Sequence, residues 1–158
     1  MKTKRPSPKE FDSSKYEIMI EKLHVNMSEL EFERLSEVVV PHVLENCEGF
    51  RRVEKGPKFR GTPFDFFGFK EGRPYIIEYK GSLKSFNAPG ETQKRRLQEV
   101  LNKIEGLHVA LLQVKLTKSK SKSQYRIFYD DEMDFLFRGK KAPLEPIVSW
   151  LTERMKKA

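Results

Sequence analysis

The feature that most constrains the fold is the short run Lys70-Glu71-Gly72-Arg73, which separates two segments of strand-like composition. Pro63 to Phe69, before it, is rich in phenylalanine, and Pro74 to Lys80, after it, alternates with period two. Strands joined by so short a turn must pair as an antiparallel hairpin. Any fold of this chain therefore contains a sheet built around that hairpin.

Apolar periodicity predicts a helix before the hairpin. Ser28 and Glu31 have the spacing of a capping box, and apolar residues then recur at helical intervals. These residues are Phe32, Leu35, Val38, Val39, His42 and Val43. Pro41 removes a backbone donor within this helix, so we expect a kink or a break near Val40.

The remaining segments define the fold class. We expect a strand from Phe50 to Glu54 before the hairpin, and a helix, two strands and a last helix after it. The latter are Glu91 to Ile104, His108 to Leu116, Tyr125 to Tyr129, and Pro143 to about Lys156. This order is typical of an α/β sandwich with a mixed central sheet. The connection from Thr117 to Ser123 alternates lysine and serine, which predicts a solvated loop.

Length and charge indicate one basic domain. A chain of 158 residues can be stabilised by one hydrophobic core, so we expect a single domain over residues 15 to 158. Residues 1 to 14 combine basic residues and proline without periodicity, which predicts a flexible basic tail. The 31 lysines and arginines outnumber the 23 aspartates and glutamates, and the formal charge of +8 favours nucleic acid as a partner.

The single cysteine and the absence of long apolar runs exclude several classes of protein. Cys47 alone cannot form a disulfide framework, an iron–sulfur cluster or a zinc site of several thiolates. No apolar run approaches the roughly eighteen residues that span a bilayer, and the lysine-rich start lacks the apolar segment of a secretory signal. The sequence therefore predicts no membrane partner and, by default, a cytoplasmic location.

Three charged residues on the hairpin predict a metal-dependent site. Glu78 and Lys80 lie two residues apart on one strand, which places them on the same face about 7 Å apart, and the hairpin can bring Asp65 beside Glu78. Adjacent carboxylates repel unless a cation lies between them, and Mg²⁺ or Mn²⁺ suits carboxylates combined with water and phosphate oxygens. The backbone carbonyl of Tyr79 can add a ligand, and Lys80 can hold the attacking water.

These residues resemble a known family. Thr62-Pro63-Phe64-Asp65 followed by Ile76-Ile77-Glu78-Tyr79-Lys80 is similar to the signature of the PD-(D/E)XK nuclease superfamily, which includes restriction endonucleases, Holliday junction resolvases and RecB-like exonucleases. The resemblance covers roughly residues 28 to 116. It implies a restriction-endonuclease-like three-layer sandwich with an αβββαβ core, followed in this chain by a C-terminal helix. It also implies a metal-dependent deoxyribonuclease in which Asp65 and Glu78 bind the metal and Lys80 is catalytic. One departure is Phe64, which stands between Pro63 and the aspartate.

The resemblance implies two further site residues. Many members carry a glutamate on the first helix that points at the metal. Glu31 falls on the apolar stripe of that helix and is the preferred residue, with Glu37 and Glu45 as alternatives. RecB-like and phage-lambda-exonuclease-like members place a glutamine on the helix after the E-x-K strand, and Gln93 occupies that place.

Clusters of basic residues predict where a nucleic acid would bind. They are Lys94, Arg95 and Arg96 after Gln93, and Lys118, Lys120 and Lys122 in the polar connection. Such side chains contact the phosphates of DNA or RNA. A second hypothesis is therefore a catalytically inactive DNA- or RNA-binding module on the same fold, and a third is an interaction protein whose acidic first helix docks a partner. Because enzymes that cut both strands are often dimers, a homodimer is a further hypothesis.

Overall fold

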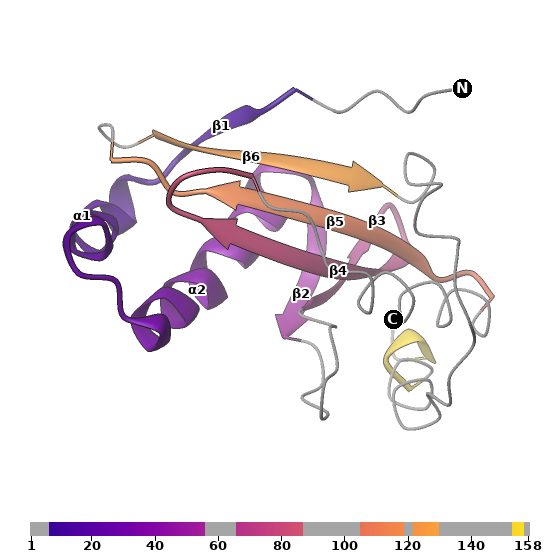
Figure 1. Ribbon diagram of the computed structural model, residues 1–158. Helices are drawn as coiled ribbons and strands as arrows, with labels where there is room; N and C mark the ends of the chain where they lie inside the picture. The colour runs from indigo at the N-terminus through magenta and orange to yellow at the C-terminus, as the bar shows by residue number, and fades with distance from the viewer. Residues whose placement is uncertain (1–6, 56–65, 87–104, 119–121, 130–152, 157–158) are drawn as a thin grey trace, which may run out of the picture.

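The computed structural model describes residues 7–55, 66–86, 105–118, 122–129 and 153–156 (Figure 1). The strands in these ranges are β1 (Lys9–Asp12), β2 (Phe50–Lys55), β3 (Phe66–Lys70), β4 (Arg73–Ser82), β5 (His108–Lys115) and β6 (Lys122–Tyr129). The helices are α1 (Glu17–Val25), which follows a short 3-10 turn at Ser14–Tyr16, and α2 (Glu29–Cys47). Residues 153–156 are also helical.

The described strands form one mixed sheet in the order β1-β6-β5-β4-β3-β2. Strands β2, β3 and β4 pair antiparallel, β4 pairs parallel with β5, and β6 lies antiparallel between β5 and β1. The prediction of an α/β fold with a mixed sheet is thereby confirmed. The predicted helix 91–104, and residues 143–152 of the predicted last helix, lie outside the described ranges.

The turn between β3 and β4 sets the register of the centre of the sheet. Lys70 pairs directly with Arg73, so only Glu71 and Gly72 form the turn. Both have positive φ, 53° and 75°, as a type I′ hairpin turn requires. Glycine adopts this conformation without a steric penalty. The predicted antiparallel hairpin is confirmed.

Helix α2 begins at the predicted cap. The Ser28 side chain accepts a hydrogen bond of 3.4 Å from the backbone N–H of Glu31. The helix then continues through Pro41, so the expected break near Val40 does not occur. Val40 and Val43, on either side of the proline, are fully buried. Their packing offsets the hydrogen bond that the proline removes.

One side of α2 packs against one face of the sheet (Figure 1). The helix contributes Leu35, Val39, Val40, Val43 and Leu44, and the sheet contributes Phe66, Tyr75, Ile77, Ala110, Leu112, Val114, Tyr125 and Ile127. Val38, expected on the apolar stripe, is instead 54% exposed. It lies about 100° around the helix from Val39, on the side away from the sheet.

Strand β1 corrects the prediction of a flexible tail over residues 1 to 14. Lys9–Asp12 pairs antiparallel with β6, and Phe11 is buried in the core. The strand is held mainly by backbone hydrogen bonds and carries one buried side chain, so no apolar alternation signals it. The domain therefore includes residues before position 15; residues 1–6 lie outside the described ranges.

The prediction of a solvated loop from Thr117 to Ser123 is wrong at the C-terminal end of that segment. Strand β6 begins at Lys122 rather than at Tyr125, and Ser123 is fully buried. The Ser123 hydroxyl donates to the Ser13 hydroxyl at 3.1 Å and accepts from the Thr117 backbone N–H at 3.3 Å. A polar side chain with hydrogen-bond partners can be buried, so its polarity did not exclude it from the core.

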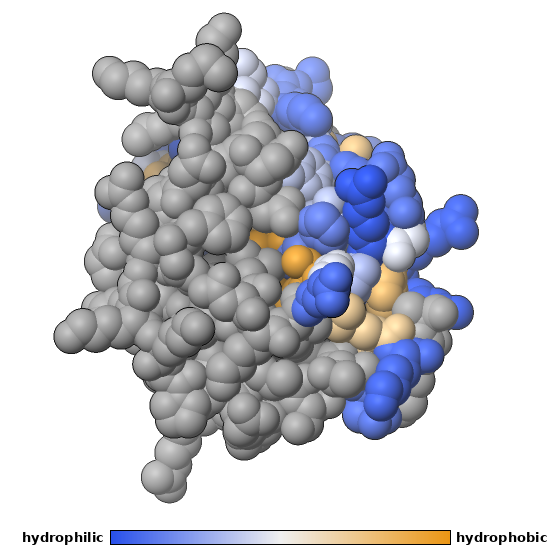
Figure 2. Space-filling view, turned by 90° about the vertical axis from the view of Figure 1, so that its right-hand side faces the viewer, coloured by the Kyte–Doolittle hydropathy of each residue, from blue (hydrophilic) through white to orange (hydrophobic). Residues whose placement is uncertain are grey.

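Hydrophilic residues predominate among the described residues on the side of the molecule that Figure 2 shows. Apolar residues appear there as separate small patches, including one near the centre of the view and one at the lower right (Figure 2). Among the residues that the structure describes, no helix combines the length and apolar character needed to cross a membrane.

Candidate functional site

Glu78 and Lys80 lie on the face of the sheet opposite α2. Tyr79, which lies between them, and Ile77, which precedes Glu78, pack toward α2. The Tyr79 hydroxyl lies 2.7 Å from the Ser36 hydroxyl of that helix. Because side chains alternate along a strand, Glu78 and Lys80 project from the other face. Glu78 is 0% exposed and Lys80 is half-buried. The structure thus brings a buried acid and an amine to one face of one strand.

A row of polar side chains crosses three strands at the level of Lys80. The register pairs Lys80 with Gln113 on β5, and Gln113 with Arg126 on β6. Gln113 is 4% exposed, and its Oε1 accepts a hydrogen bond of 3.1 Å from Arg126 Nε. The guanidinium carbon of Arg126 lies 4.4 Å from the centre of the Phe86 ring. We call Lys80, Gln113 and Arg126 the polar row.

Several predicted site residues fall outside the described ranges. They are Asp65, Gln93, Lys94, Arg95, Arg96 and Lys120. The described β3–β4 ladder ends at the pair Phe66 and Ile77, immediately after Asp65 in the chain. Among the residues that are described, no three or more histidine, cysteine, aspartate or glutamate side chains gather in a way that could hold a metal ion.

The structure places the three helix glutamates named as possible metal ligands on α2, away from Glu78. Glu31 is 39% exposed in its side chain and forms an ion pair of 3.3 Å with Lys22 of α1. Glu37 forms an ion pair with Lys55, and Glu45 is exposed. All three belong to α2, which covers the face of the sheet opposite Glu78. The stripe that packs on the sheet begins beyond Glu31, so this residue faces α1 instead.

The two described lysines of the polar connection lie on the surface. Lys118 is exposed just after β5, and Lys122 begins β6. The Lys122 ammonium forms an exposed ion pair of 3.5 Å with Glu10 of β1. Exposed ion pairs contribute little to stability. These lysines can therefore exchange such pairs for contacts with phosphates.

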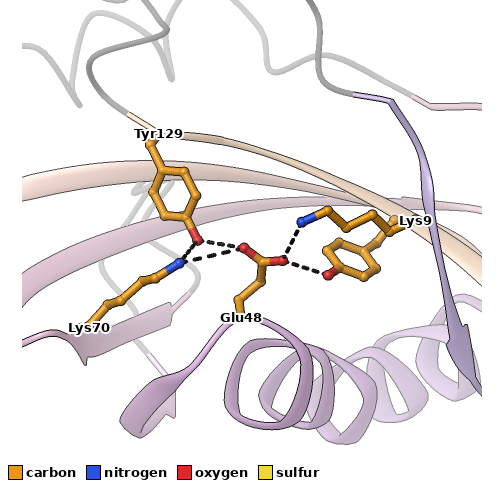
Figure 3. A network of polar contacts seen from close by, with 5 residues as sticks. Lys9, Glu48, Lys70 and Tyr129 are labelled. Carbon is orange, nitrogen blue, oxygen red and sulfur yellow. Dashed lines mark hydrogen bonds and ion pairs between the residues drawn. The ribbon is translucent and has the colours of Figure 1, made fainter.

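Sequence reasoning missed Glu48, which is buried at the end of α2 (Figure 3). The Tyr125 hydroxyl donates to one carboxylate oxygen at 2.5 Å, and the Tyr129 hydroxyl donates to the other at 2.6 Å. The ammonium groups of Lys9 and Lys70 lie 3.3 Å and 3.7 Å from these oxygens. These five residues form what we call the Glu48 cluster, which joins α2 to β1, β3 and β6.

The Glu48 cluster favours an ionised glutamate. Burial by itself would raise the pKa of Glu48, but the hydrogen bonds from Tyr125 and Tyr129 and the charges of two lysines lower it below its ordinary value. Burial and the carboxylate raise the pKa of both tyrosines, which therefore remain donors at neutral pH. An acid at the C-terminal end of a helix opposes the helix dipole. This unfavourable position is a feature of the sequence that could have indicated that Glu48 has partners elsewhere in the chain.

The polar row and Glu78 combine groups that suit an anionic substrate. They offer a carboxylate, which is a hard oxygen ligand for a divalent cation, and the cationic side chains of Lys80 and Arg126. No protein-family model matches the chain, and no curated protein matches it. Function must therefore be inferred from the chemistry and placement of these residues.

Proposed function

We propose that the protein is a divalent-metal-dependent nuclease that hydrolyses phosphodiester bonds in DNA. Asp65 and Glu78 would bind the metal, and Lys80 would activate the attacking water. The observation that carries this proposal is the β3–β4 register, in which Phe66 pairs with Ile77. If the same ladder continued by one residue on each strand, it would pair position 65 with Glu78. Paired residues of antiparallel strands share a face, so that continuation would set the two carboxylates side by side.

The donor chemistry fits Mg²⁺ or Mn²⁺. Both cations prefer carboxylate and carbonyl oxygens together with water, and the backbone carbonyl of Tyr79 is a further oxygen donor beside Glu78. A carboxylate that is 0% exposed, as that of Glu78 is, is compatible with ionisation only near positive charge. When bound, the cation would polarise the scissile phosphate and lower the pKa of a nucleophilic water.

Lys80 supplies a fixed positive charge next to this position. The half-buried Lys80 shares the face of Glu78, two residues further along β4. There it can orient the attacking water and offset the negative charge that develops on the phosphate during hydrolysis. In the same proposal, Gln93 positions the water or the DNA backbone, and Lys94, Arg95 and Arg96 contact phosphates.

The order of the described elements supports the three-layer sandwich in this proposal. Helix α2 is followed by the antiparallel strands β2, β3 and β4, and β5 lies parallel to β4. A parallel neighbour requires a crossover connection, which is usually helical. The predicted helix 91–104 falls in that connection. Placed on the Glu78 face, it would complete the αβββαβ core and bring Gln93 toward the site.

The proposal is tested by cleavage of supercoiled DNA with Mg²⁺ or Mn²⁺. We expect the purified chain to nick or degrade the DNA, and EDTA to stop it. Asp65→Asn, Glu78→Gln and Lys80→Ala should each lower the rate by about a hundredfold or more while DNA binding persists. Glu21→Gln, at an exposed position of α1, is the control and should cleave normally.

Two outcomes would contradict the proposal. One is wild-type protein that binds DNA but fails to cleave it with every divalent cation tested, which would favour the alternative of an inactive DNA- or RNA-binding module. The other is cleavage that survives all three substitutions, since the activity would then lie elsewhere or in a contaminant.

A further inference from the structure

Arg126 is held in one orientation by two kinds of contact. Its Nε donates to Oε1 of Gln113 at 3.1 Å, and its guanidinium lies 4.4 Å from the centre of the Phe86 ring and 5.9 Å from that of Phe128. An arginine side chain loses considerable rotamer entropy when it is fixed in this way. These contacts fix the plane of the guanidinium on this face of the sheet.

The position of Arg126 relative to Lys80 indicates a function for the fixed guanidinium. Both side chains are half-buried and lie on the face opposite α2, at either end of the polar row. Two strand spacings separate them, or about 10 Å. A DNA strand rises about 3.4 Å per nucleotide, so two or three nucleotides cover this distance. A phosphate near the scissile one would therefore reach Arg126 while the scissile phosphate lies at Lys80.

We propose that Arg126 forms a phosphate-binding subsite for the DNA strand that the enzyme cuts, a proposal that rests on the function given above. Gln113 and Phe86 are positioning residues that fix the plane of the guanidinium. A fixed guanidinium presents its N–H groups in the planar geometry that matches phosphate oxygens. With the scissile phosphate at Lys80 and a second phosphate at Arg126, the DNA strand would cross the sheet from β4 toward β6.

Binding of a labelled DNA duplex in EDTA, measured by fluorescence anisotropy over a range of salt concentrations, tests the subsite without any catalytic step. Arg126→Gln should weaken binding at low salt about tenfold. It should also make the slope of log affinity against log salt shallower by about 0.9, because one phosphate contact is lost. Arg34→Gln, the same substitution at an exposed position of α2 on the other face, should leave both quantities unchanged.

Two further variants separate phosphate contact from a merely structural role. Arg126→Met keeps an unbranched apolar stem at this position, so it should fold even if Arg126→Gln does not, and it should show the same shallower slope. Phe86→Leu keeps the charge and should keep the slope, while affinity falls. The proposal is overturned if folded Arg126→Gln or Arg126→Met binds with the wild-type slope and affinity, or if the wild-type protein does not bind DNA.

The outcomes also separate this proposal from the nuclease function. Cleavage by the wild type, together with an unchanged slope in both Arg126 variants, would remove the subsite and leave the nuclease proposal intact. A shallower slope in those variants, together with no cleavage under any divalent metal, would support the subsite and remove the nuclease proposal.

Discussion

Two buried glutamates, Glu48 and Glu78, lie on opposite faces of the sheet in different surroundings. Glu48 and Glu78 are the buried acids among the described residues. Glu48 lies on the α2 side, and its carboxylate is bound by two tyrosine hydroxyls and faces two lysines (Figure 3). Glu78 lies on the other face, in line with Lys80 and beside the polar row.

Because the surroundings of the two carboxylates differ, burial alone does not identify a functional acid. The partners of Glu48 come from β1, β3 and β6, so its charge ties together segments that are far apart in the sequence. We infer that Glu48 is a structural acid. Glu78 pairs with Leu111 of β5 and shares its face of β4 with Lys80, and under the proposed function it is a metal ligand. The same substitution at the two glutamates should therefore have different effects on cleavage and on stability.

Glu78→Gln should separate activity from stability. The amide has nearly the same shape but cannot bind a divalent cation as a carboxylate does, so cleavage should fall by about a hundredfold or more. The free energy of unfolding should fall by no more than about 1 kcal/mol, because the amide is nearly isosteric with the carboxylate and still forms hydrogen bonds. Cleavage rates and urea unfolding curves measure the two effects. A large loss of stability with little loss of cleavage per folded molecule would assign Glu78 a structural role.

Glu48→Gln should show the reverse pattern. Removing one partner from a buried charge cluster leaves donors and lysines without their acceptor, and we expect a loss of about 3 kcal/mol in the free energy of unfolding. Cleavage per folded molecule should remain near that of the wild type. If Glu48→Gln instead cleaved poorly while unfolding at the wild-type urea concentration, the assignment of the two glutamates would have to be exchanged.

The stability that Glu48 contributes should depend on pH in a defined direction. Its folded-state pKa is lower than its ordinary value, so the unfolded chain binds the proton more readily. The contribution is therefore complete above the ordinary glutamate pKa of about 4.3 and is lost as pH falls through the folded pKa. The difference in unfolding free energy between wild type and Glu48→Gln should shrink as pH is lowered below about 4.3. A difference that is constant or grows on acidification would contradict the ionised cluster.

The two lysines of the Glu48 cluster should differ in importance. The side chain of Lys9 is 62% exposed and that of Lys70 is 24% exposed. Exposed ion pairs contribute roughly 0 to 1 kcal/mol, so Lys9→Ala should have the smallest effect of these substitutions. Lys70→Ala should lower the free energy of unfolding by more, because Lys70 also donates to the Tyr129 hydroxyl at 2.5 Å. Unfolding in urea measures both, and a larger loss for Lys9→Ala would show that β1 is anchored chiefly by that ion pair.

The sequence predicts what is determined locally. The capping residue Ser28, the turn at Glu71 and Gly72, and the alternation of β4 depend on neighbouring residues, and the structure has the helix, the hairpin and the strand where they were expected. Glu78 and Lys80 share a face for the same reason, because their relation follows from period two within one strand.

Features that depend on distant partners could not be predicted in this way. Strand β1 exists because Lys9–Asp12 pairs with β6, more than a hundred residues later in the chain. Ser123 is buried because Ser13 meets its hydroxyl, and Glu48 because Tyr125 and Tyr129 do. No local pattern encodes such pairs. Likewise, assigning Glu31 to the site required knowing which face of the sheet α2 covers.

We propose that Glu78 and Asp65 hold a divalent cation on the face opposite α2. The most direct test is a crystal structure of the full chain grown with Mn²⁺, with the ion located by its anomalous scattering. We predict an ion about 2 to 2.5 Å from a carboxylate oxygen of Glu78, with Asp65 as a second ligand and Lys80 alongside. An ordered Asp65 on the opposite face from Glu78, or Mn²⁺ bound only elsewhere, would contradict the account.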